Sequence, residues 1–475
     1  MRQIDRIYID GEFVEPHGRE RVDLHNPATG AVIGQVRLGD EEDARRAIAA
    51  AKRALPVLAT VTKAERVELL KSLQAAMRTG AEDLTAAIIE EYGAPASRAA
   101  WMARFAAESI GVAAATLEAY DFRQRIGSAE VFMEPVGVVG LITPWNSNAG
   151  FICNKLAYAL AAGCTAVIKP SEMSAIQTEI VLKRLHAAGL PRGFYNVVNG
   201  RGDVVGAELT RHPDIAKISF TGSTAVGKTI LRGAAETIKR VTLELGGKSP
   251  VLVLDDVDLA ATVPLLLEAG FMNSGQACIA GTRILISEKR RAELETLITV
   301  AVAQVKVGDP RDPATAIGPM VSRKQYERVQ GYIRKGIDEG ARLLVGGEGH
   351  PDGLGGFFVR PTVFSDVRND MTIAREEIFG PVLSILTYRD EEEAIAIAND
   401  TSYGLSAYVL SSDQAHAEHI ASRLQSGRVV INGAAHEPLA PFGGFKQSGL
   451  GRENGVFGLE TYLEPKTVLG SRAVA

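Results

Sequence analysis

The chain has 475 residues, 46% of them hydrophobic and 23% charged, so it can bury a large core and divide it between two or three domains. A formal net charge of -5, with no segment dominated by Lys or Arg, argues against nucleic-acid and acidic-membrane partners. Three cysteines in so long a chain favour free thiols in a reducing compartment over a disulfide framework.

Targeting segments are not expected. Asp5, Asp10 and Glu12 leave no continuous apolar stretch near the N-terminus, and Asn154 and Lys155 interrupt the nearest candidate for a membrane span. We therefore expect a cytoplasmic protein.

The first predicted element is a β-hairpin. Residues 7–9 and 13–14 are apolar and flank Asp10-Gly11, a pair typical of tight hairpin turns. An Ala-rich helical pattern with breaks follows over residues 41–120.

From residue 136 the chain alternates short apolar strands with helices. Strands are predicted at residues 136–142, 164–168, 195–198 and 218–220, and helices at 150–162 and 175–188. Such alternation predicts an α/β fold with a parallel, doubly wound sheet of nucleotide-binding type. A second alternating region runs from Gly246 to about Phe445.

Residues 222–229 match the spelling of a P-loop, and residues 251–256 imitate the strand and acidic pair of its companion motif. This reading makes the protein an NTPase. Against it, Val226 is a stiff β-branched residue where a loop wrapped around phosphate favours flexible backbone. Under either reading, Gly222, Ser223 and Thr224 offer N–H donors and a positive helix end to a pyrophosphate.

Polar residues follow two of the predicted strands, at the sheet edge where α/β proteins bind ligands. Asn146 follows the strand at 136–142 and is also a candidate helix N-cap. Lys169 and Glu172 end the next strand, where they could bond ribose hydroxyls or form a capped helix start with exposed charges.

The segment from residue 241 to 279 pairs a carboxylate with a thiol. Glu244 lies in Leu-Glu-Leu-Gly-Gly-Lys and Cys278 in Ser-Gly-Gln-Ala-Cys, and the flanking small residues allow a substrate to approach the backbone. A base and a nucleophile in such settings favour covalent catalysis. Cys153 and Cys164 lie in helical and strand patterns and are interpreted as small buried hydrophobes.

The ordered set of motifs resembles the NAD(P)-dependent aldehyde dehydrogenase superfamily from about residue 26 to 466. The motifs are Pro-Trp-Asn, Lys-Pro-Ser-Glu, Phe-Thr-Gly-Ser-Thr, Leu-Glu-Leu-Gly-Gly-Lys, Gly-Gln-Ala-Cys, Glu-Glu-Ile-Phe-Gly-Pro and Pro-Phe-Gly-Gly-Phe-Lys. The resemblance implies an NAD-binding Rossmann-like domain (1–114 and 136–246, with 447–462 packing back on it), an α/β catalytic domain (247–446), and a small β oligomerisation flap (115–135 and 463–475).

The resemblance also implies the chemistry. Cys278 would attack the aldehyde and form a thiohemiacetal, which becomes a thioester when hydride passes to the nicotinamide. Asn146 and the Cys278 N–H would stabilise the oxyanion, and Glu244 would activate the water that hydrolyses the thioester. Because a water-activating base is present, water rather than coenzyme A is the expected acyl acceptor.

The matched positions imply a set of cofactor contacts. Lys169 and Glu172 would hold the adenosine ribose, Ser223 the pyrophosphate, and Glu377 with Phe379 the nicotinamide end. A carboxylate at Glu172 would repel a 2′-phosphate, so NAD is expected over NADP. The cofactor positions are Ile142, Thr143, Trp145, Lys169, Ser171, Glu172, Gly202, Phe220, Gly222, Ser223, Gly227, Leu245, Gln325, Glu377 and Phe379. No metal is expected, and His416 and His419 are interpreted as part of a charged surface helix.

The substrate entrance departs from the commoner family pattern. Aromatic positions after Pro-Trp-Asn are matched here by Ser147 and Asn154, which predicts a wider and more polar entrance suited to polar aldehydes or semialdehydes. The entrance positions are Ser147, Asn154, Ala277, Ile279, His436 and Glu437. No Arg is clearly placed to bind a substrate carboxylate.

Three classes of function remain open at this point. The first is a non-acylating aldehyde dehydrogenase acting as a homodimer or homotetramer on a small aldehyde. The others are a P-loop NTPase built on residues 222–229 and a non-catalytic scaffold protein. Retention of Cys278, Glu244 and Asn146 together disfavours the scaffold.

Overall fold

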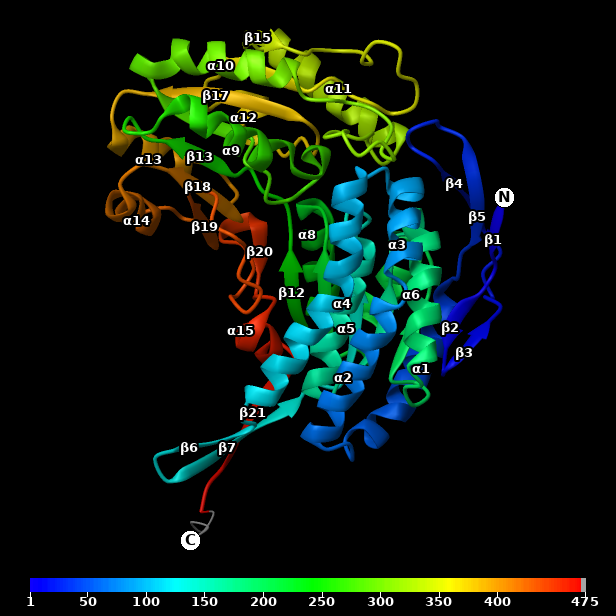
Figure 1. The fold of residues 1–475 in the computed structure, drawn as a ribbon. Coiled ribbons are helices and arrows are strands. Elements are labelled where there is room, and N and C mark those ends of the chain that lie inside the picture. Colours follow the sequence, from blue (N-terminus) through cyan, green and yellow to red (C-terminus); the bar gives the residue numbers. More distant parts are fainter. Residues whose placement is uncertain (471–475) are drawn as a thin grey trace.

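The computed structural model describes residues 1–470; residues 471–475, the end of the predicted flap, lie outside the described part. The chain forms two lobes, each built around a mainly parallel sheet (Figure 1). No helix of residues 1–470 is long and apolar enough to cross a membrane.

The first lobe contains an eight-stranded sheet in the order β20-β12-β11-β8-β9-β10-β2-β3. Its parallel strands are β8 (Val138–Ile142), β9 (Thr165–Lys169), β10 (Tyr195–Val197), β11 (Lys217–Thr221) and β12 (Arg240–Glu244). The antiparallel edges are β2 (Ile7–Ile9), β3 (Glu12–Val14) and β20 (Gly449–Leu450). The predicted parallel sheet and N-terminal hairpin are therefore confirmed.

Helices cover both faces of this sheet because each buried strand sends alternate side chains to opposite sides. The helices are α1 (Glu41–Leu58), α2 (Lys63–Arg78), α3 (Ala81–Ala87), α4 (Ala96–Ala119), α5 (Asn148–Ala162), α6 (Ala175–Ala187), α7 (Ala207–Arg211), α8 (Thr224–Ala235) and α15 (Gly455–Glu460). Val139 and Leu141 of β8 join the core with α2, α4, α5 and α6, whereas Val138 and Ile142 join the core with α1, α7 and α8.

The second lobe contains a seven-stranded sheet in the order β15-β16-β17-β14-β13-β18-β19, parallel except at β15. The strands are β13 (Pro250–Val253), β14 (Arg283–Ser287), β15 (Arg342–Val345), β16 (Thr362–Ser365), β17 (Val382–Tyr388), β18 (Ser406–Leu410) and β19 (Arg428–Ile431). The helices are α9 (Leu259–Phe271), α10 (Arg291–Ala303), α11 (Arg323–Asp338), α12 (Thr372–Arg375), α13 (Glu391–Asn399) and α14 (Gln414–Ser422).

A three-stranded sheet projects from the first lobe (Figure 1). It joins β6 (Arg123–Ile126) and β7 (Ala129–Pro135) to β21 (Leu463–Val468), which runs antiparallel to β7. Residues 115–119, which the resemblance placed in the flap, belong to α4 and not to this sheet. The helical pattern predicted over residues 41–120 agrees with that end of α4.

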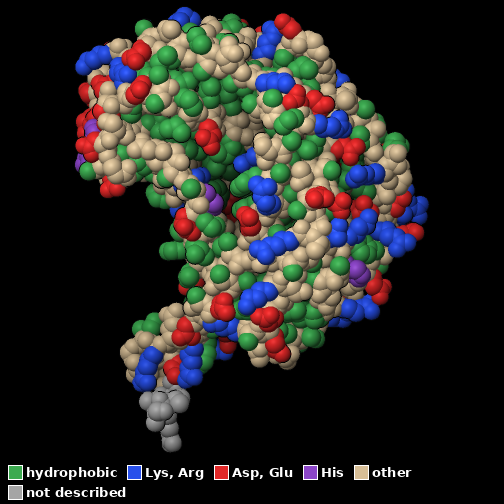
Figure 2. Space-filling view, viewed as in Figure 1, with side chains coloured by type: hydrophobic (Ala, Val, Ile, Leu, Met, Phe, Trp, Pro, Cys, Tyr) green, Lys and Arg blue, Asp and Glu red, His purple; other side chains and the backbone are tan. Residues whose placement is uncertain are grey.

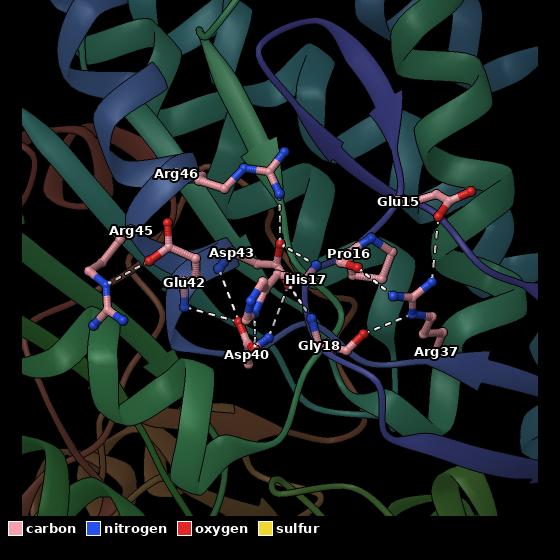
Figure 3. Close-up of polar contacts among 10 residues, drawn as sticks. All are labelled: Glu15, Pro16, His17, Gly18, Arg37, Asp40, Glu42, Asp43, Arg45 and Arg46. Atoms are coloured by element: carbon pink, nitrogen blue, oxygen red, sulfur yellow. Dashed lines mark hydrogen bonds and ion pairs between the residues drawn. The ribbon is translucent and has the colours of Figure 1, made fainter.

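A fourth sheet, of β1 (Arg2–Ile4), β5 (Val32–Arg37) and β4 (Arg21–His25), packs at the N-terminus. Figure 3 shows how the intervening chain is tied to α1. The buried carboxylate of Asp43 accepts N–H bonds from His17, Gly18 and Asp40 and pairs with Arg46 at 3.1 Å. The start of α1 thus organises the N-terminal arm.

Candidate active site

The three predicted catalytic residues line one cavity between the lobes. Asn146 follows β8, Glu244 ends β12, and Cys278 lies beyond α9, on the side of the second lobe. Figure 2 shows that this face of the molecule is hollowed between the lobes. The carboxyl ends of β8, β11 and β12 form one wall, which is where parallel sheets place ligands.

Cys278 lies half-buried in this cavity, while Cys153 and Cys164 are fully buried, as predicted. Burial, with the carboxylates of Glu377 and Glu244 nearby, raises the pKa of Cys278 to about 12. The thiol is therefore protonated at neutral pH and needs a base to become a nucleophile.

A left-handed turn presents the thiol. Asn273, Ser274 and Gly275 have φ angles of 55°, 58° and 74° in succession. Each non-glycine residue in this conformation costs about 1–2 kcal/mol. The turn is held by the Gly318 N–H, which donates to Ser274 Oγ at 2.9 Å, and by backbone contact at Gly380, where a Cβ on Gly275 would lie 2.2 Å from the Gly380 carbonyl carbon.

Asn146 is tied to the same turn. Its Nδ2 donates to the Gln276 carbonyl at 3.1 Å, and Asn273 Nδ2 donates to the Asn146 carbonyl at 3.3 Å. The N-cap interpretation of Asn146 is wrong, because Ser147 occupies the cap position of α5. The Asn146 amide is instead a donor at the cavity wall, beside Cys278.

Glu244 is 2% exposed, and neither carboxylate oxygen has a hydrogen-bond partner in the described part of the chain. Burial and the nearby Glu453 raise its pKa well above the ordinary value, although Lys155 and Arg452 oppose the shift. A carboxylate with a raised pKa can take and return a proton near neutral pH.

Sequence reasoning missed the ion pair behind Glu244. Lys155 of α5 pairs with Glu453 and also bonds Ser219 Oγ at 2.9 Å. The sequence did contain a signal for this pair, namely Lys155 in the mostly apolar sequence of α5. A lysine that is buried in such a helix needs a charged partner. That partner lies 298 positions further along the chain.

A second cavity continues from the first and shares Trp145, Gly222 and Ser223 with it. It is lined by the predicted cofactor residues Ile142, Thr143, Trp145, Lys169, Ser171, Glu172, Gly202, Phe220, Gly222 and Ser223. Lys169 Nζ donates a hydrogen bond to Glu172 Oε2 at 3.1 Å. Both residues line this cavity, in agreement with a place at the strand end that binds a ligand.

The remaining predicted cofactor residues, apart from Gly227, line the first cavity: Leu245, Gln325, Glu377 and Phe379. Glu377 accepts the Gly247 N–H at 3.1 Å, and burial raises its pKa to about 7. Gln325 Nε2 donates to the Phe379 carbonyl at 2.8 Å and so fixes the loop. The Phe379 ring stands edge-on to Trp145 at 5.4 Å.

Gly227 lies outside both cavities. It belongs to the first turn of α8, where a Cβ would meet Leu245 at 2.7 Å, so its small size serves helix–strand packing.

Helix α8 begins at Thr224 and Lys228 is exposed, which leaves no loop to wrap a phosphate. Asp255 and Asp256 follow β13 of the other sheet and bond Ser287 and residues 411–413. The P-loop reading is therefore not supported.

The entrance differs from the sequence expectation at one position. Asn154 is buried and donates to Asn454 Oδ1 at 3.3 Å, because the start of α15 covers that turn of α5. Phe151, which sequence reasoning did not single out, lines the catalytic cavity instead.

The other entrance positions flank the nucleophile or lie further out. Ala277 and Ile279 adjoin Cys278, and the Tyr408 hydroxyl donates to the Ile279 carbonyl at 2.8 Å. His436 and Glu437 belong to an exposed loop over residues 432–440.

Comparisons with known proteins agree in one family. A family model described as "Aldehyde dehydrogenase family" matches residues 13–468. The chain is 46% identical over 474 residues to a 3-succinoylsemialdehyde-pyridine dehydrogenase of a Pseudomonas species, covering 99% of each protein.

Solved structures give the same result. An aldehyde dehydrogenase C mutant from Pseudomonas syringae, complexed with NAD+ and octanal, matches with a TM-score of 0.97 and 43% identity over 99% of this chain and 98% of that one. An aldehyde dehydrogenase from Mycobacterium tuberculosis complexed with NAD+ matches with a TM-score of 0.96 and 41% identity over 100% and 99%.

Proposed function

The chain belongs to the aldehyde dehydrogenase family, and from that premise we propose that it oxidises an aldehyde to a carboxylic acid, with NAD as hydride acceptor and Cys278 as nucleophile. The observation that carries the proposal is the meeting of Cys278, Glu244 and Asn146 around one cavity that continues into a second, nucleotide-sized one.

The first step is addition of the Cys278 sulfur to the aldehyde carbon. Glu244 takes the thiol proton, since the thiol is protonated in the resting site and Glu244 is the unpartnered carboxylate lining the same cavity. The Asn146 amide leaves the Gln276 carbonyl and, with the Cys278 N–H, stabilises the oxyanion of the thiohemiacetal. Each donor of this kind is worth about 3 kcal/mol in comparable sites.

A bound NAD would supply the hydride acceptor that oxidation of the thiohemiacetal requires. The residues present fit such a cofactor: Glu172 and Lys169 suit the adenosine ribose, Ser223 and the start of α8 suit the pyrophosphate, and Glu377 suits the second ribose. Because Glu172 would repel a 2′-phosphate, we propose NAD over NADP.

Hydrolysis of the thioester completes the cycle. Glu244 first releases the thiol proton to solvent and then takes a proton from water. The resulting hydroxide adds to the acyl carbon, the C–S bond breaks to release the acid, and Glu244 returns its proton to the Cys278 thiolate. Gly443 packs close to this carboxylate, since a Cβ there would lie 2.8 Å from Glu244 Oε1. Because Glu244 can serve as a base for water, we propose water as the acyl acceptor.

The proposal extends to organisation and location. We assign residues 1–114, 136–246 and 447–462 to an NAD-binding domain and 247–446 to a catalytic domain. The projecting sheet would join copies of the chain in a homodimer or homotetramer, and the protein would act in the cytoplasm. The exposed strand β6, with Ile126 63% exposed, supports the role of this sheet in assembly.

The decisive measurement is NADH absorbance with a mixed panel of aldehydes, for the wild type and Cys278→Ser. We expect NADH formation to be lost in the variant while NAD still binds. Persistent NADH formation by Cys278→Ser would exclude the covalent mechanism. Cys153→Ser, which changes a thiol buried away from the cavity, is the matched control and should keep its activity.

A further inference from the structure

Asn148, the first residue of α5, is fully buried although its side chain is polar. Its Nδ2 donates to Thr178 Oγ1 at 2.9 Å and to the Ser174 carbonyl at 3.4 Å, and its Oδ1 accepts the Thr143 hydroxyl at 3.3 Å. Thr143 follows β8, whereas Ser174 and Thr178 belong to the start of α6. One side-chain amide therefore joins two segments of the first lobe.

Both segments that Asn148 joins carry residues of the site. The loop after β8 carries Asn146, which lines the first cavity. The end of β9 and the segment after it carry Lys169 and Glu172, which line the second cavity. The Thr143 N–H also donates to the Lys169 carbonyl at 3.1 Å. The proposed oxyanion donor and the proposed cofactor residues are thus connected through hydrogen bonds behind the cavities.

Asn146 has to change its hydrogen-bond partner in the proposed reaction. Its Nδ2 bonds the Gln276 carbonyl at 3.1 Å and would leave it for the oxyanion. A donor stabilises the oxyanion well only when it is already held in place, so the backbone of Asn146 needs other supports. Asn273 bonds the Asn146 carbonyl from the second lobe. From the first lobe, the loop is held through the bond between Thr143 and Asn148.

The start of α6 is held independently of Asn148. The buried carboxylate of Glu91, which follows α3, accepts the Ile176 N–H at 2.8 Å and the Gln177 N–H at 3.1 Å. It also accepts Gln177 Nε2 at 3.2 Å. Three bonds to one carboxylate keep the first turn of α6 in place. Loss of the Asn148 amide should therefore release the loop of Asn146 and leave the helix where it is.

We propose that Asn148 is a positioning residue for formation of the thioester: it holds the loop that carries Asn146 against the start of α6, and so aligns the oxyanion donor with the residues that hold the cofactor. This inference rests on the proposed function and adds a residue that lines neither cavity. The aldehyde carbon must meet the donor and the cofactor at once, and a misplacement of about 1 Å can cost about a hundredfold in rate.

The test is a double-mutant cycle on the rate of the first turnover, measured as NADH formed in rapid mixing with saturating NAD and aldehyde. Asn148→Ala should lower this rate about tenfold in the wild-type background. In Asn146→Ala the same change should cost less than about twofold, because the donor that Asn148 positions is already absent. The Kd of NAD, measured by calorimetry, should stay nearly unchanged, since Glu91 still holds α6.

Thr178→Val carries the same test if Asn148→Ala folds poorly. It removes the partner of Asn148 Nδ2 with little change of shape, and Thr178 lines neither cavity. It should slow the first turnover about threefold when Asn146 is present, the effect of one hydrogen bond, and have no effect in Asn146→Ala. Thr262→Val is the matched control, because that buried hydroxyl bonds the Asp258 carbonyl at the start of α9.

The outcomes separate this proposal from a structural role and from the proposed function. Equal losses for Asn148→Ala in the two backgrounds would mean that Asn148 only supports the fold. A loss confined to NAD affinity would place its effect at the cofactor. Either result, or an unchanged first turnover, would overturn the proposal. Absence of NADH with every aldehyde in the wild type would instead mean that the proposed function fails.

Discussion

Neither carboxylate oxygen of Glu244 accepts a hydrogen bond within residues 1–470, and a second carboxylate, that of Glu453, lies close by. Both features favour its protonated form. Its folded pKa is raised, so the fraction of Glu244 able to act as a base grows as pH rises through that pKa. A raised carboxylate pKa also means that the folded state holds a proton which the unfolded state releases, so this group lowers stability as pH rises above the ordinary value of Glu.

This arrangement predicts a separation of the two half-reactions. Glu244→Gln keeps the shape of the site but removes the base, so turnover should fall by about 10²–10⁴-fold. In rapid-mixing experiments we expect NADH to approach one equivalent more slowly than in the wild type, because Cys278 loses its base. Almost no turnover should follow, because the thioester, once formed, persists. The rise of steady-state kcat with pH should disappear in the variant.

Loss of this first equivalent together with turnover would show that Glu244 is needed mainly to deprotonate Cys278. Glu460→Gln provides the control, since that carboxylate bonds Tyr120 away from the cavity and its loss should leave both phases unchanged.

At the scale of elements, the strand-end residues were predictable and the contacts between distant segments were not. A strand followed by Asn146, or by Lys169 and Glu172, places those side chains at a known edge of a parallel sheet. Helical periodicity, in contrast, does not say what covers a helix face. Asn154 was assigned to the entrance because it matches an aromatic position in the family pattern, but the start of α15 packs on that turn of α5.

The same limitation explains why the surroundings of the catalytic residues escaped prediction. The Lys155–Glu453 pair depends on tertiary packing alone. The left-handed turn before Cys278 had a partial signal, because Asn and Gly tolerate that conformation, but Ser274 between them gave none.

The contact of the N-terminal arm with α1 gives a pH-dependent prediction. His17 Nδ1 lies 2.6 Å from Asp40 Oδ2, and this hydrogen bond and charge raise the pKa of His17. Because the pKa of His17 is raised in the folded state, its charged contact with Asp40 stabilises the fold fully below the unfolded pKa of about 6.5. This stabilisation is lost as pH rises through the folded pKa. His17→Gln should therefore lower Tm at pH 6 and leave it unchanged at pH 9.

The comparison is made by thermal unfolding at both pH values, with His25→Gln as control. His25 is an exposed histidine in the same arm that contacts a carbonyl, not a carboxylate. An equal loss of Tm at pH 6 and pH 9 for His17→Gln would mean that packing, not charge, ties the arm to α1.

At the scale of the whole molecule, the projecting sheet of β6, β7 and β21 is covered by little of its own chain. All four residues of β6 are exposed, and both β6 and β21 are sheet edges with unpaired backbone groups. Exposed edges of this kind invite pairing with another chain. Assembly through this sheet would cover apolar side chains that are otherwise left in solvent.

Ile126→Glu places a charge in that surface and should shift the protein to a smaller species in light scattering after size exclusion. Since Ile126 is remote from Cys278, kcat of the smaller species should change little. Val57→Glu, at an exposed apolar position on α1, is the matched control and should leave the assembly unchanged. An unchanged mass for Ile126→Glu would argue that copies associate through another surface.

The left-handed turn at Asn273–Gly275 has a consequence for how the chain can vary. The chain before Cys278 is held at Gly318 and Gly380, and the chain after it returns to α9, where the Gly281 N–H donates to the Ala269 carbonyl at 3.0 Å. Cys278 is thus fixed from both sides of a short loop. A substitution that shifts the last turn of α9 should therefore displace the sulfur as well, so this end of the helix has little freedom to vary.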